Sequence, residues 1–109
     1  MMNIMKILAL FLFASSNVMA ATPQCSSFAL TQAEKLLSFH VNGDDRARIE
    51  PQTKQLPSIA NPANKDQKFI VLEVMGYVYK GQYRMRLIYY PLGKECVLMG
   101  QEILELSNL

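Results

Sequence analysis

The sequence predicts an α+β fold: one N-terminal helix packed on one face of an antiparallel β-meander of three to five strands, stapled by one disulfide. Three observations predict it. Residues 68–90 are rich in β-branched and aromatic side chains, as two long strands would be. Residues 31–41 repeat their apolar positions at helical spacing. Finally, Cys25 precedes the helical segment and Cys96 follows the two strands.

The first twenty residues have the pattern of a signal peptide. Lys6 supplies a weak positive charge, residues 7–14 form an apolar segment too short to span a bilayer, and residues 18–20 resemble a cleavage site. We therefore expect cleavage after Ala20, which leaves residues 21–109 as a single small α+β domain. The predicted location is periplasmic or secreted, with no stable membrane anchor after cleavage.

The charge balance bears on the class of partner. Without Lys6, the chain has ten basic and nine acidic residues and a net charge of +1. Nucleic-acid binding depends on neutralising phosphates with an excess of cations, so no nucleic-acid partner is expected.

The two cysteines are predicted to form a disulfide, because a pair of cysteines in a small exported domain is most often oxidised. A bond between Cys25 and Cys96 closes a loop of roughly 70 residues, which the chain-entropy model values at about 4 kcal/mol. The sequence has no CxxC motif and a single histidine, His40, so neither a metal site nor a cofactor is predicted.

The helix is expected over residues 31–41. Thr31 and Glu34 have the spacing of a capping box at its start, and Asn42-Gly43 is a typical left-handed stop at its end. The positions that recur on its apolar face are Ala33, Leu36, Leu37, His40 and Val41.

Residues 44–67 are polar and interrupted by prolines. Weak alternation predicts short strands at 46–50 and 54–59, and Pro57 would confine the second to an edge of the sheet. Residues 61–64 read as a turn.

The stretch 68–90 is predicted to be a hairpin with Lys80-Gly81 as its two-residue turn, so that Tyr79 pairs with Gln82. Side chains alternate between the two faces of a strand. One face then bears Ile70, Leu72, Val74, Gly76 and Val78 opposite Tyr83, Met85, Leu87 and Tyr89. The other bears Phe69, Val71, Glu73, Met75 and Tyr77 opposite Arg84, Arg86, Ile88 and Tyr90. The first face has no charge and is the expected core face.

The last strand is predicted over residues 96–106, with a bulge at Gly100. If Cys96 lies opposite Tyr89, its side chain points to the apolar face. The helix has to cover that face, so the predicted disulfide agrees with the predicted faces.

No residue pattern predicts catalysis. His40 has no nucleophile or acid at a recognisable spacing, and the sequence has neither a phosphate-binding loop nor a calcium loop. Instead, the mixed hairpin face combines residue types that are common in protein interfaces. The candidate interaction residues are Met75, Tyr77, Arg84, Arg86 and Tyr90. The alternative is that the Pro-rich segment covers this face.

The sequence therefore favours a small exported, non-catalytic binding module that holds an unidentified protein partner in the envelope. An inhibitor or immunity-type protein acting on an envelope or foreign enzyme belongs to this class. One alternative is a structural subunit that self-associates through the sheet face or the edge of the last strand. A second is a small-ligand carrier or an enzyme that uses His40 and the crevice between helix and sheet.

Overall fold

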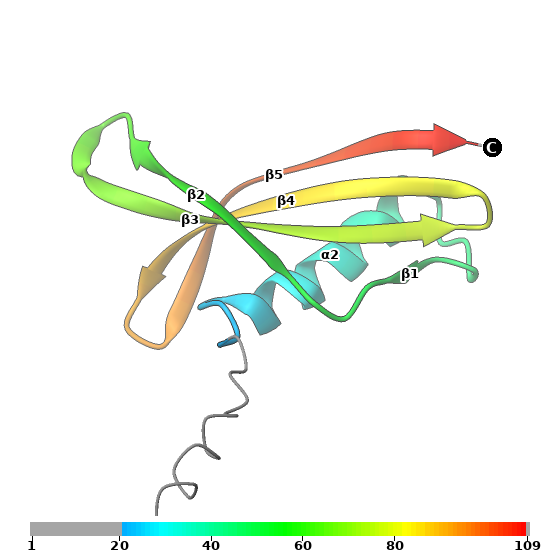
Figure 1. Ribbon diagram of the computed structural model, residues 1–109, viewed down its shortest axis with the longest axis horizontal. Coiled ribbons are helices and arrows are strands. Elements are labelled where there is room, and N and C mark those ends of the chain that lie inside the picture. Colours follow the sequence, from blue (N-terminus) through cyan, green and yellow to red (C-terminus); the bar gives the residue numbers. More distant parts are fainter. Residues whose placement is uncertain (1–20, 109) are drawn as a thin grey trace, which may run out of the picture.

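The computed structural model describes residues 21–108 (Figure 1). Within this range a helix precedes an antiparallel, curled sheet, as the sequence predicts. The helix is α2, Ser26–His40. The strands are β1 (Arg48–Ile49), β2 (Lys54–Asn61), β3 (Asn64–Val78), β4 (Gly81–Leu92) and β5 (Glu95–Asn108). The predicted signal peptide lies outside the described residues.

The strand order is β1-β3-β4-β5, and β2 also pairs with β3. Because β4 occupies one side of β3, β1 and β2 share the other side: β1 pairs near Gly76, and β2 pairs from Glu73 back toward the start of β3. Figure 1 shows α2 lying along one side of the sheet, and the β2–β3 and β4–β5 turns pointing away from each other. Residues 54–61 thus form an edge strand, as Pro57 predicts.

The hairpin register differs from the prediction by two residues. Val78 pairs with Gly81, so the turn is Tyr79-Lys80, and Tyr79 takes a positive φ of 55°. A shift of two keeps every side chain on its predicted face, so burial of the apolar face does not distinguish the two registers. Gly81 serves close packing instead: an added Cβ would lie 3.1 Å from the Tyr83 side chain.

The helix begins five residues earlier than predicted, and the capping-box prediction is wrong. Thr31 lies inside α2, and no side chain caps its first turn. Cys25 precedes the helix with a φ of 70° and is fixed by its disulfide, and Ala29 in the added turn is fully buried. Burial of this turn outweighs the local capping signal at Thr31.

The core lies between α2 and the charge-free face of the sheet. Ala29, Ala33 and Leu37 of the helix pack against it, while Leu36 and Val41 are only partly buried. Small side chains on α2 let it approach closely. At Gly76 an added Cβ would be 2.9 Å from both Leu37 Cδ2 and Met85 Cε. The sheet side of this core consists of Ile70, Leu72, Val74, Val78, Tyr83, Met85, Leu87 and Tyr89.

The predicted disulfide is present. Cys25 and Cys96 are bonded across a sequence separation of 71 residues, with their Cα atoms 5.9 Å apart. Cys96 lies opposite Pro91 rather than Tyr89, which faces Leu98. Residues 91 and 89 point to the same face of β4, so Cys96 still reaches the helix side. The difference arises at the turn, because Leu92 pairs with Glu95 and only Gly93 and Lys94 connect the two strands. Farther along β5, an extra residue, Met99, lies between the pairs that Leu98 and Gly100 make. The bulge expected at Gly100 is therefore present beside it.

The helix ends in the predicted left-handed stop, because Asn42 and Gly43 have φ angles of 57° and 73°. Just beyond it, Asp44 accepts hydrogen bonds from the backbone N, Nε and Nη2 of Arg46 at 2.9, 3.0 and 2.8 Å. The side-chain hydrogen bond from Arg46 is the largest cause that lowers the pKa of Asp44 from 3.8 to about 2. Stability from this carboxylate is thus present above pH 3.8 and lost as the pH falls through about 2.

We expect the side-chain carbon of Asp44 to titrate in NMR spectra with a midpoint near 2, and the midpoint in Arg46→Ala to rise part of the way toward 3.8. The rise is partial because the backbone N–H of residue 46 still donates to the carboxylate. Equal midpoints in the two proteins would contradict this account.

Candidate binding face

The face of the sheet opposite α2 is the candidate site, and we call it the open face. It bears residues 69, 71, 73, 75 and 77 of β3 and residues 84, 86, 88 and 90 of β4, with their neighbours on β2 and β5. No described helix or strand packs across it. The helix packs on the other side, and β2 contacts β3 only, beside it in the sheet. The Pro-rich segment therefore forms a strand at the sheet edge instead of a cover.

The structure places all five predicted interaction residues on this face. Each is half-buried, because cross-strand neighbours shield part of every side chain. The residues are Met75, Tyr77, Arg84, Arg86 and Tyr90. Their geometry agrees with the sequence analysis, whereas their role in binding stays a prediction.

A row of alternating charge crosses the open face. Lys54 of β2 lies opposite Glu73 of β3, which lies opposite Arg86 of β4, which lies opposite Glu102 of β5. Glu73 and Arg86 are direct cross-strand partners because the register differs by two residues from the predicted one. Arg86 Nε donates to Glu73 Oε2 at 3.3 Å. Opposite charges in direct register support each other across the strands.

Arg84 lies beside this row and adds a further positive charge. Its Nε lies 3.8 Å from the same Glu73 Oε2 and is buried without a hydrogen-bond partner. The side chains of Glu73, Arg84 and Arg86 are 13%, 27% and 34% exposed. One carboxylate is therefore shared by two guanidinium groups in a partly dehydrated setting. A positive charge is left in excess, and it is available to an anionic group from outside.

The half of the open face nearest the β2–β3 turn is apolar and aromatic. Phe69 and Val71 in this half are buried, each 7% exposed, and Phe69 meets the half-buried Tyr90 edge to face with their centroids 6.3 Å apart. Tyr90 is therefore the ring that a partner can contact. Ile59 and Val97 extend this area to the two edges of the sheet and are 44% and 41% exposed. The face thus joins an aromatic area to a cationic centre, which is the mixture typical of interface hot spots.

Tyr77 marks the opposite end of the open face. Its hydroxyl donates to Glu50 Oε2 at 2.8 Å, and this hydrogen bond is the main cause that raises the pKa of Tyr77 above 10.0. The ring is thereby held in one orientation by the segment that follows β1. A fixed aromatic side chain loses little conformational entropy when a partner covers it.

His40 lies away from the open face. The sequence places it on the apolar side of the helix, but in the structure it is exposed in the last turn of α2, with its ring 5.6 Å from that of Tyr83. Among the residues described, no three His, Cys, Asp or Glu side chains lie close enough to hold a metal ion.

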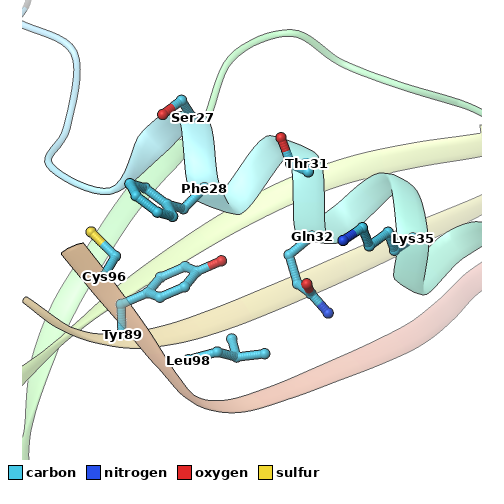
Figure 2. A pocket seen from close by; sticks show the side chains of 8 residues that line it. All are labelled: Ser27, Phe28, Thr31, Gln32, Lys35, Tyr89, Cys96 and Leu98. Atoms are coloured by element: carbon cyan, nitrogen blue, oxygen red, sulfur yellow. The ribbon is translucent and has the colours of Figure 1, made fainter.

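A crevice of about 380 Å³ lies between α2 and the strands β4 and β5. Its lining residues are Ser27, Phe28, Thr31, Gln32, Lys35, Tyr89, Cys96 and Leu98 (Figure 2). Gln32 Nε2 donates to Gln101 Oε1 at 2.9 Å and ties the helix to β5. His40 does not line this crevice, so the histidine and the crevice do not form the combined site considered from the sequence. The helical lining residues recur at spacings of three and four, a signal that starting the helix at Ser26 would have revealed.

Comparison of the chain with family models, with curated proteins and with solved structures finds no match. No helix in residues 21–108 is both long and apolar enough to cross a membrane.

Proposed function

We propose that the protein is a small exported, non-catalytic binding protein that holds a protein partner on the open face. The observation that supports this most is the pair Arg84 and Arg86 around a single Glu73, in the middle of a sheet face that no described element covers. Unneutralised arginine beside aromatic surface is a feature of contact sites, and a sheet face that is only solvated does not need it.

The partner surface that complements this face presents a carboxylate to Arg84 and apolar side chains to the aromatic area. An incoming carboxylate pairs with the guanidinium in a fork geometry and replaces the interaction that Glu73 divides between two arginines. The disulfide between Cys25 and Cys96, together with the predicted signal peptide, supports an extracytoplasmic setting. An inhibitor or immunity-type protein that acts on an envelope or foreign enzyme fits these requirements.

Charge reversal tests the proposal. In the double variant Arg84→Glu and Arg86→Glu, the two new carboxylates join those of Glu73 and Glu102 on this face, so an acidic partner is repelled. We expect this variant to lose capture of its partner from an envelope extract, by at least about tenfold in affinity. The matched control reverses two cations away from the face, Lys35 and Lys94, with the same change in net charge, and should retain capture.

Because like charges beside Glu73 also affect folding, the milder variant Arg84→Gln is measured in parallel, with circular dichroism to verify the fold. Capture that is unchanged in both face variants would refute the proposed role of the open face. The self-association alternative stays a prediction that light scattering decides: a monomer at micromolar concentration argues against a structural subunit. For the carrier or enzyme alternative, loss of function in a folded His40→Ala variant would be the supporting result.

A further inference from the structure

The outer edge of β5 is a second surface to which a partner can bind. β5 runs over 14 residues and pairs with β4 on one side only. In the part of the chain that the structure describes, no strand pairs with its other side. Such an edge presents a row of backbone N–H and C=O groups to which another strand can add.

The two edges of the sheet differ in how they are protected. The β1–β2 edge is divided between two strands, and Pro57 and register shifts interrupt β2. Proline, irregular pairing and short length are the devices that keep edges from pairing with other chains. Glu95–Asn108 contains no proline, lysine or arginine. Its two irregularities lie at Met99 and Leu106, so residues 100–105 form a regular edge between them.

The side chains of β5 define the chemistry of a partner strand. Five large apolar residues are exposed on it: Val97 (41%), Leu98 (37%), Met99 (50%), Leu104 (47%) and Leu106 (43%). Between them, Glu95, Glu102 and Glu105 are exposed and are the charged residues of the strand. The edge is thus apolar and exclusively acidic.

We propose that the outer edge of β5 binds an extended segment of another protein in which two basic residues flank two apolar residues. Glu102 and Leu104 lie on one face of the sheet, and Ile103 and Glu105 lie on the other. This spacing therefore sets a basic residue opposite each glutamate and an apolar residue opposite Leu104. The row of alternating charge across the open face ends at β5 with an acidic residue, Glu102; the row consists of Lys54, Glu73, Arg86 and Glu102. The next strand in the sheet continues the alternation when it places a lysine or arginine opposite Glu102. Its apolar side chains on the same face cover Leu104. Backbone pairing supplies affinity, and the charges select the partner.

A second copy of this chain fits the edge less well. Two antiparallel β5 strands would bring the glutamates of both copies to one seam with no cation from either strand. The β2 edge of another copy offers Lys54, but Pro57 lies three residues away and interrupts it. The segment that fits is therefore foreign and basic. This inference concerns the edge of the sheet and does not depend on the proposed role of the open face.

The test uses the disulfide-bonded protein and a capped seven-residue peptide, Val-Lys-Val-Val-Lys-Val-Val, whose two lysines flank two valines. Saturating peptide should slow amide hydrogen exchange at residues 100–105 and shift their NMR signals, while the α2 amides stay unchanged. Glu102→Gln with Glu105→Gln should weaken binding by about tenfold. The control Glu34→Gln with Asp45→Asn, two exposed acids away from β5, makes the same change in net charge and should not weaken it. A peptide with glutamate in place of lysine should not bind.

Three results would overturn the inference. The first is exchange at β5 that does not slow at saturating peptide. The second is equally tight binding by the same peptide with N-methylated backbone amides, since this shows charge attraction without strand pairing. The third is protection of β5 that grows with protein concentration and needs no peptide, which assigns the edge to a second copy. Loss of partner capture in the Arg84 and Arg86 variants is a separate result, so the two proposals fail independently.

Discussion

Reduction of the Cys25–Cys96 disulfide is expected to lower the free energy of unfolding by about 4 kcal/mol. The bond joins residues 71 apart in the chain, and opening a loop of this length returns much conformational freedom to the unfolded state. It also connects the residue before α2 to the start of β5, and so it joins the helix covalently to the sheet. A domain this small has only about 5–15 kcal/mol of net stability, so its reduced form should unfold at far lower denaturant concentration.

Urea denaturation of the oxidised and reduced protein measures this difference without changing the sequence. Two variants then separate the covalent bond from backbone conformation: Cys96→Ala combined with either Cys25→Ala or Cys25→Gly. Residue 25 has a φ of 70°, which glycine adopts without strain, so the glycine variant should be the more stable of the two. Equal urea midpoints for the oxidised and reduced protein would contradict the predicted contribution of the bond. Mass spectrometry without reductant should show two hydrogens fewer than in the dithiol.

Leu37→Ala is expected to cost about 2–5 kcal/mol, the range for large-to-small substitutions at fully buried sites. Leu37 is 1% exposed and reaches from α2 onto the sheet at Gly76, where an added Cβ would lie 2.9 Å from Leu37 Cδ2. Removing it leaves a cavity between helix and sheet that Ala29 and Ala33 are too small to fill. Phe39→Ala is the matched control: Phe39 lies two residues further along the same helix and is 85% exposed, so its loss should change stability by less than about 0.5 kcal/mol.

A double-mutant cycle sharpens the test of this contact. Gly76→Ala alone should cost about 1–3 kcal/mol, because its new Cβ would lie 2.9 Å from Leu37 Cδ2. In the Leu37→Ala background that atom is gone, and the flexible end of Met85 can move aside, so the cost should fall. Additive costs in urea unfolding would show that the two residues do not contact in solution.

The register of the hairpin is a feature that local sequence patterns did not predict correctly. Period-two alternation assigns each residue of 68–90 to the face on which the structure has it, and burial of the apolar row makes that assignment robust. The sequence predicts the turn at Lys80-Gly81, because a two-residue loop that ends in glycine is a common hairpin signal. The structure uses Tyr79-Lys80 and needs Gly81 for the close approach of the Tyr83 ring, a contact between side chain and backbone that no turn preference expresses.

The helix start and the position of His40 show the same limit. A capping box at Thr31 is a local signal of modest energy, whereas a disulfide at Cys25 and a buried Ala29 fix the preceding turn from outside the helix. His40 was placed on the apolar side by its spacing from Ala33 and Leu37. It lies in the last helical turn, where the ring meets Tyr83 at the rim of the core and stays exposed.

The amino-acid sequence by itself determined the order of helix and strands, the cysteine pair, and which side chains share a face, because these depend on spacing along the chain and on the pairing of the two cysteines. Tertiary structure decided the register, the two strands that divide one edge of β3, and the exposure of the opposite edge at β5. It also decided that Arg84 and Arg86 share Glu73 on an uncovered face. These features arise from contacts between segments that are far apart in the chain. Other registers and strand pairings would satisfy the same local sequence pattern equally well, so the pattern cannot select among them.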